Sequence, residues 1–166
     1  MIEIIILNMI RYYDMNYIKV GRMKEFYHKK VNYINNNTSN SVLFLTIFLV
    51  EMTFRGDFTI KIMESILAKY FKRIVVKRDL SIGPFQLKPS FVEKYYKNQW
   101  QVIDLMDIDF SIVVLELFIT AHHTLSDEEL IVLFHSGESI TKYEDTNVYL
   151  YILKRLKQEF FGREEI

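Results

Sequence analysis

The most informative stretch of this 166-residue sequence is SIGPFQLKPS, which occupies residues 81–90. It contains both prolines of the chain and one of its five glycines. Gly83 and Pro84 predict a turn, because glycine tolerates backbone conformations closed to other residues and proline has no N–H to donate. Pro89 suits the first turn of a helix. We therefore expect a turn followed by a helix from Ser90 to about Tyr96.

The segment before this stretch is dominated by an apolar run from Val42 to Val50. It is preceded by Asn, Ser and Thr over residues 35–41, whose side chains favour turns and helix N-caps because they bond nearby backbone N–H groups. A helix buried on nearly all sides is therefore expected from Val42 to about Phe54, with Gly56 ending it. The run is shorter than the roughly 20 residues of a membrane span, so no span is expected.

The remaining segments mainly place apolar residues at helical spacing. Ser126 and Glu129 form the capping-box pattern Ser-x-x-Glu at the start of one helix, which should stop at Gly137. The β-branched residues 74–76 instead predict a short strand and hence a short β hairpin. Further helices are expected from Thr59 onward, over about 109–122 and over about 145–161.

Composition excludes several classes of function. The chain has 21 Lys and Arg against 21 Asp and Glu, so no global field attracts nucleic acid or an acidic membrane. It has no cysteine, which excludes disulfides and thiolate metal sites. Lys and Arg recur over residues 69–78, either as a solvated edge around a buried strand or as a basic rim facing an anionic polymer.

The N-terminal segment carries an apolar stretch over residues 4–10. No basic region precedes this stretch and no small-residue cleavage site follows it, so a signal peptide is not expected. The sequence then favours a protein that is cytoplasmic or exported by a non-classical route.

Glu51 is a candidate catalytic residue because it lies at the end of the most apolar predicted helix. Burying an unpaired carboxylate is costly, so such a group tends to keep its proton. A carboxyl that stays protonated near neutral pH can give that proton to a glycosidic oxygen. The structural alternative is that Glu51 binds a helix-end N–H or pairs with Arg55.

Four segments in this order resemble the lytic transglycosylase branch of the lysozyme-like superfamily: EMTFR at 51–55, SIGPFQLKPS at 81–90, LFHSG at 133–137 and TNVY at 146–149. The strongest match begins at Gly83, where the family has Gly-Leu-Met-Gln-Leu/Ile-x-Pro. The resemblance covers about residues 40–155. It implies a mostly α, lysozyme-like single domain over residues 41–166, preceded by a helical or irregular extension over 1–40.

The resemblance also implies roles for single residues. Glu51 would be the catalytic acid, Gly83 would let the backbone approach the sugar, and Gln86 would bond the substrate or brace the site. Without the resemblance, Gln86 is equally compatible with a surface position in a simple turn.

Phe134 and His135 stand where the family usually has Tyr and Asn. Tyr149, in the last helix, could supply the hydroxyl that Phe134 lacks, or could simply pack in the core. His135 could bond sugar or lie at a helix end favoured by the helix dipole. The predicted substrate-binding residues are Ser81, Gly83, Phe85, Gln86, Phe134, His135 and Tyr149.

Two features depart from the family pattern. Met52 follows Glu51, whereas the family commonly has Ser after its catalytic Glu. The separation between Glu51 and Gly83 also exceeds the commonest one, and an inserted hairpin would account for the difference.

The implied activity is cleavage of the MurNAc-GlcNAc β-1,4 bond of peptidoglycan, with one Glu acting first as acid and then as base. The 6-hydroxyl of the sugar would close an anhydro ring, and neither cofactor nor metal is required. Hydrolysis would instead need a second carboxylate, for which Asp57 and Asp79 are candidates. His122 and His123 are adjacent, so they do not form an i, i+4 metal pair.

Two other functions fit the sequence. The same fold could be a non-catalytic module that binds glycan or protein, with Glu51 in a structural role. Alternatively, the chain is an unrelated helical interaction protein, whose 11 Tyr and 13 Phe fill a core or form a binding face.

Overall fold

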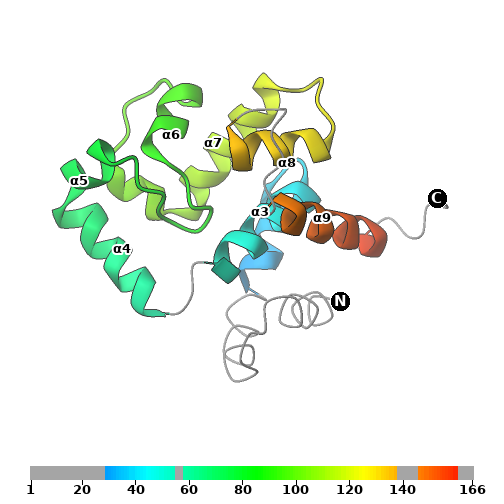
Figure 1. The fold of residues 1–166 in the computed structure, drawn as a ribbon, viewed down its shortest axis with the longest axis horizontal. Coiled ribbons are helices and arrows are strands. Elements are labelled where there is room, and N and C mark those ends of the chain that lie inside the picture. Colours follow the sequence, from blue (N-terminus) through cyan, green and yellow to red (C-terminus); the bar gives the residue numbers. More distant parts are fainter. Residues whose placement is uncertain (1–28, 55–57, 138–145, 161–166) are drawn as a thin grey trace. The chain divides into compact units, whose positions relative to one another are not determined.

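The computed structural model describes residues 29–54, 58–137 and 146–160, and these are mostly helical (Figure 1). Within these ranges there is no strand, and the β interaction is an isolated antiparallel bridge between Ile82 and Leu87. The mostly α class is therefore confirmed. Residues 29–37 are helical. The elements that follow are α3 (Ser41–Phe54), α4 (Phe58–Tyr70), α5 (Lys72–Lys77), α6 (Pro89–Tyr95), the 3-10 helix η1 (Val102–Met106), α7 (Ile108–Ala121), α8 (Asp127–Ser136) and α9 (Thr146–Phe160).

The chain divides into two compact units. Unit 1 comprises residues 1–46 and 131–166, and unit 2 comprises residues 47–130. The sequence had suggested a boundary near residue 40. Residues 81–90, which contain both prolines, lie wholly within unit 2.

The apolar run forms α3 as expected, and residues 42–50 are all buried. The polar segment before it supplies the predicted cap, because the Asn40 side chain accepts a hydrogen bond from the Leu43 backbone N–H at 3.1 Å. Gly56, the predicted stop, lies outside the described residues.

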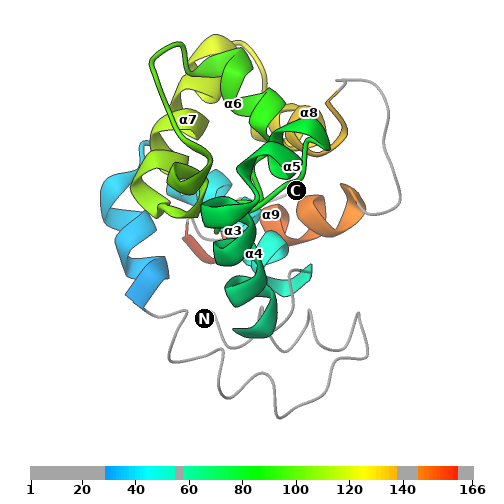
Figure 2. The ribbon, with the colours of Figure 1, turned by 90° about the vertical axis from the view of Figure 1, so that its left-hand side faces the viewer.

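The prediction of a strand at residues 74–76 is wrong, because these residues lie in α5. The helical path continues from α4, since the backbone N–H of Phe71 bonds the Leu67 carbonyl and that of Val75 bonds the Phe71 carbonyl. Val75 is the buried residue of α5, while its β-branched neighbours are exposed. Local hydrogen bonding and one buried anchor thus outweigh the weak strand preference of the three side chains. Figure 2 views the chain from the side of α4 and α5.

Aromatic side chains join α6 to α7 in unit 2. The ring of Phe91 lies 5.3 Å from that of Phe118, and Tyr95 lies 5.2 Å from Phe118. The Tyr95 hydroxyl and the Nε2 of His122 are 3.0 Å apart, within hydrogen-bonding distance. The predicted helices at about 90–96 and 109–122 are confirmed, and this cluster explains how the first of them, though only seven residues long, is held in place.

The capping box at the start of α8 forms as predicted. Glu129 Oε2 accepts hydrogen bonds from the backbone N–H and the hydroxyl of Ser126, at 2.8 and 2.9 Å, and the Glu129 N–H donates to the Ser126 hydroxyl at 3.3 Å. The backbone and side-chain bonds from Ser126 lower the pKa of the Glu129 carboxyl below its ordinary value of 4.5. The ionised carboxyl therefore stabilises the folded state above pH 4.5, and this stabilisation is lost as the pH falls through the lowered pKa.

Glu129→Gln is expected to lower the free energy of unfolding at pH 7 and to have little effect well below pH 4.5, where the carboxyl is protonated in both states. Urea unfolding across a pH series measures the difference. Glu93→Gln, at an exposed carboxyl on α6, serves as the control. A Glu129→Gln penalty that stayed constant from pH 7 to acid would contradict this role of the charge.

Candidate functional site

Residues 82–87 form a tight turn in unit 2. The bridge between Ile82 and Leu87 closes it, and the Gly83 carbonyl accepts a hydrogen bond from the Gln86 N–H at 3.2 Å. Gly83 has φ +88° and Gln86 has φ +50°, so both lie in the left-handed region. Such a conformation is uncommon for a residue with a side chain, which points to constraints on Gln86 from its surroundings.

Close packing of the turn against a neighbouring backbone requires a glycine at position 83. A Cβ atom at this position would lie 1.8 Å from the carbonyl oxygen of Leu105, in η1. From the resemblance, Gly83 is expected to let the backbone approach a sugar. The structure supplies a different partner, because the backbone of the turn lies directly against the backbone of η1.

Glu64 is the carboxylate that the structure shows bonded to this turn. Its Oε2 accepts a hydrogen bond from the Gly83 N–H at 3.2 Å, and its Oε1 accepts one from Gln86 Nε2 at 2.9 Å. Gln86 Nε2 also donates to the Gly83 carbonyl at 2.8 Å. The carboxyl is buried, with 6 % of the residue exposed. Glu64, Gly83 and Gln86 thus form one closed hydrogen-bonded group.

Phe85 and Ser81 complete the turn segment. Phe85 is fully buried, and its ring lies 5.7 Å from that of Phe48 in α3. Its side chain was expected to bind substrate, whereas this position makes it an anchor that fixes the turn to the core. Ser81 is partly exposed and directly precedes the bridge.

The other three predicted binding residues lie in unit 1. His135, in the last turn of α8, has its Nδ1 2.8 Å from the Thr146 hydroxyl at the start of α9. Its ring lies 4.8 Å from the ring of Tyr149, which is buried. The structure therefore brings His135 and Tyr149 together. Phe134 is partly buried in the same helix as His135.

Glu51 lies in the last turn of α3 and is partly buried. Of the candidate second carboxylates, Asp79 bonds Ser90 with both oxygens, at 2.8 Å to the backbone N–H and 2.6 Å to the hydroxyl. This pairing ties the segment that follows α5 to the first turn of α6. Asp57 lies outside the described residues.

Two further properties bear on the kind of site. Over the described ranges, no three or more His, Asp or Glu side chains are grouped so that they could hold a metal ion. Nor does any helix in that part of the chain have the length and apolar character needed to cross a membrane.

No known protein family, curated protein or solved structure matches this chain. The assignment of the candidate site therefore rests on its geometry and on the sequence resemblance. That geometry reveals Glu64, which the sequence analysis did not single out because it lies in an amphipathic helix and not after a long apolar run. A signal was present: Ser65 follows Glu64, and Glu64 is 19 residues from Gly83, closer than Glu51.

Proposed function

We propose that this chain is a lysozyme-like glycosidase of the lytic transglycosylase type, which cleaves the MurNAc-GlcNAc β-1,4 bond of peptidoglycan with Glu64 as its acid and base. The observation that carries the proposal is the pair of hydrogen bonds from Gly83 and Gln86 to the buried Glu64 carboxyl. Those two residues belong to the stretch that most strongly resembles the family, and both were predicted to belong to the site.

The hydrogen bonds to Glu64 suit a group that becomes an anion during the reaction. Burial disfavours the charged form, whereas N–H donors favour it. Once the proton has gone, the Gly83 N–H and Gln86 Nε2–H stabilise the negative charge on the two oxygens. These donors are held in place by the turn, so they need little rearrangement during the reaction.

The proposed reaction requires only one carboxyl group. Glu64 gives its proton to the glycosidic oxygen as the bond between that oxygen and C1 breaks, and the N-acetyl oxygen of the same sugar attacks C1. The Glu64 carboxylate then takes the proton of the 6-hydroxyl, and the bond from O6 to C1 forms as the N-acetyl oxygen leaves. Attack by water in place of the 6-hydroxyl gives hydrolysis. No second carboxylate is needed, and Asp79 is already bonded to Ser90.

Glu64 is preferred to Glu51 for two reasons. Ser65 follows it, as Ser commonly follows the catalytic Glu of the family, and its separation from Gly83 is shorter. The two departures noted for Glu51 are therefore removed or reduced. Glu51 remains the second candidate for the acid.

Digestion of purified peptidoglycan by the full chain tests the proposal, with products identified by mass spectrometry. Anhydro-muropeptides would support a lytic transglycosylase. Reducing-end products would indicate a hydrolase with the same acid. If the folded protein released neither product, the non-catalytic glycan-binding or protein-binding function would be favoured, and sedimentation with insoluble peptidoglycan would separate those two.

A further inference from the structure

The solvent-facing side of α4 is unusually apolar. Ile62, Ile66 and Tyr70 are four residues apart and therefore share one face of the helix, and Met63 lies beside them. Their exposed fractions are 45, 44, 67 and 57 %, respectively. The opposite face carries the buried Glu64 and Ala68. A surface helix ordinarily turns its polar face to water, whereas α4 exposes these four apolar side chains as well as Ser65 and Lys69.

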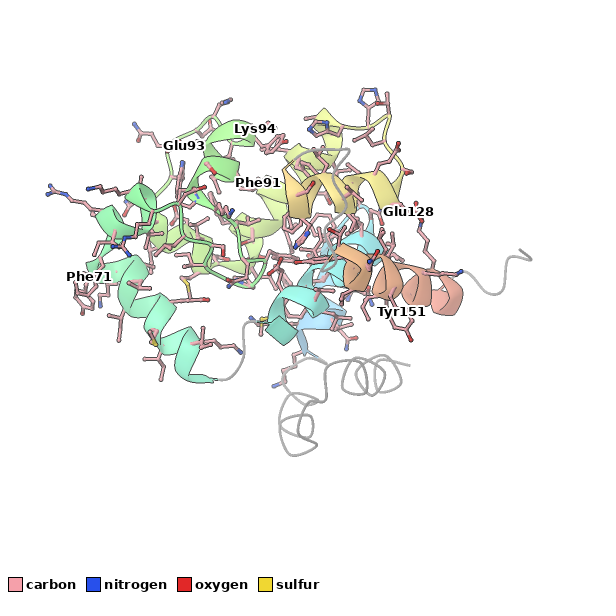
Figure 3. The ribbon with its side chains drawn as sticks, in the orientation of Figure 1. Phe71, Phe91, Glu93, Lys94, Glu128 and Tyr151 are labelled. Atoms are coloured by element: carbon pink, nitrogen blue, oxygen red, sulfur yellow. The ribbon has the colours of Figure 1, made fainter. Side chains whose placement is uncertain are left out.

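Exposed apolar side chains also occur at the junction with α5 and on two faces of α5 itself. Phe71 is 48 % exposed and lies at the outer edge of unit 2 (Figure 3), and Ile74 and Val76 are exposed as well. We call these residues and the cations among them the α4–α5 surface. Its apolar members are Ile62, Met63, Ile66, Tyr70, Phe71, Ile74 and Val76.

The charge of the α4–α5 surface is of one sign. Its exposed cations are Lys69, Lys72, Arg73, Lys77 and Arg78. Between residues 60 and 78 the one carboxylate is Glu64, which is buried and bonded to the turn. Among the described residues, no ion pair is seen for Lys72, Arg73, Lys77 or Arg78. A chain with a net charge of zero thus carries a local positive cluster interleaved with exposed apolar side chains.

We infer that the α4–α5 surface docks on an anionic lipid bilayer, with its apolar side chains at the acyl boundary and its cations against headgroup phosphates. This combination is the one that interfacial helices use: apolar burial provides one part of the affinity and attraction to anionic lipid the other. The helices are short and lie on the bilayer without crossing it. This inference is independent of the proposed catalysis.

Charge and chemistry favour a bilayer over other occupants. A soluble anionic polymer would pair with the cations but would leave the isoleucines, Met63 and Phe71 in water. A second copy of the chain in a two-fold dimer would bring the same surface to both sides, so its cations would face like cations. An anionic bilayer satisfies both the apolar and the cationic residues.

Sedimentation of the full chain with lipid vesicles tests the inference. We expect binding to phosphatidylcholine vesicles that contain phosphatidylglycerol, weakened by salt, and no binding to phosphatidylcholine alone. The double variant Ile62→Gln, Ile66→Gln should weaken binding on the order of tenfold or more, because it removes apolar contact but keeps every charge. Lys72→Gln with Arg73→Gln should weaken binding about fivefold per charge removed.

The matched control is Val113→Gln with Leu117→Gln on α7. These two residues are also four apart on one helix, with exposed fractions of 48 and 40 %. The control should bind vesicles as the wild type does. The inference is overturned if the folded wild type ignores phosphatidylglycerol vesicles, or if the control loses as much binding as the α4 variant.

Two other outcomes would also overturn it and would name the occupant. In the first, the wild type binds soluble polyphosphate but no vesicles, and the Ile62→Gln, Ile66→Gln variant binds polyphosphate equally well. This result would identify an anionic polymer as the occupant. In the second, the wild type binds no vesicles but forms a concentration-dependent dimer, and the variant does not. This result would identify a second copy of the chain as the occupant. Light scattering after size-exclusion chromatography measures the dimer. Far-UV circular dichroism establishes that each variant is folded.

Discussion

Glu64→Gln is expected to abolish peptidoglycan cleavage, with a loss of at least about a hundredfold in rate, the usual lower bound for removal of a general acid. Gln has nearly the shape of Glu but has no proton to donate at neutral pH. It also cannot become the anion that the Gly83 N–H and Gln86 Nε2–H would stabilise. The measurement is the rate of muropeptide release by mass spectrometry.

The control for this prediction is Glu51→Gln, which removes the other candidate carboxyl. It should retain most of the activity. Since Gln can accept only one of the two hydrogen bonds that Glu64 accepts, thermal unfolding of each variant is measured first, and rates are compared at a temperature where all are folded. Full activity in Glu64→Gln and its loss in Glu51→Gln would assign the acid to Glu51.

Gly83→Ala is expected to lower the free energy of unfolding strongly. The new Cβ would lie 1.8 Å from the Leu105 carbonyl oxygen, and the residue would have to keep a φ of +88°. Neither backbone is a flexible side-chain end that can swing aside, so the turn and η1 must separate. We expect a loss of more than about 4 kcal/mol in the free energy of unfolding. Thermal unfolding of the variant would then begin more than about 8 °C earlier.

Gly137→Ala provides the comparison that isolates the clash. Gly137 also has a positive φ, +72°, but a Cβ there would meet nothing within 4 Å. Gly137→Ala is therefore expected to lower the free energy of unfolding only by the strain of a positive φ, about 1–2 kcal/mol. Equal effects of the two substitutions would mean that the contact with Leu105 is relieved at little cost, contrary to this prediction.

Much of the fold could be predicted because its helices carry local signals. Asn40 before an apolar run, Pro89 at a first turn and the Ser126–Glu129 capping box each satisfy backbone groups within a few residues, so the sequence pattern alone is informative. Residues 74–76 carry the opposite local preference, and their helical state depends on the continuation from α4 and on the burial of Val75. The short helix η1 has no strong apolar period and was not anticipated.

The candidate site was predicted in part. Gly83 and Gln86 were identified because a turn with a glycine and two nearby prolines is a distinctive pattern. The carboxyl was assigned from burial of its surrounding sequence, which pointed to Glu51 on the most apolar helix. Glu64 reaches the turn from an amphipathic helix 19 residues earlier, and such a contact follows from packing that no local period encodes.

The side-chain amide of Gln86 has a consequence for what could bind beside it. Both of its N–H hydrogens have partners, one in the Glu64 carboxyl and one in the Gly83 carbonyl. The polar group that remains for a ligand is its carbonyl oxygen, which can only accept a hydrogen bond. A ligand group that bonded this oxygen would have to be a donor, such as a hydroxyl or an amide N–H, and an ionised phosphate or carboxylate has none to give.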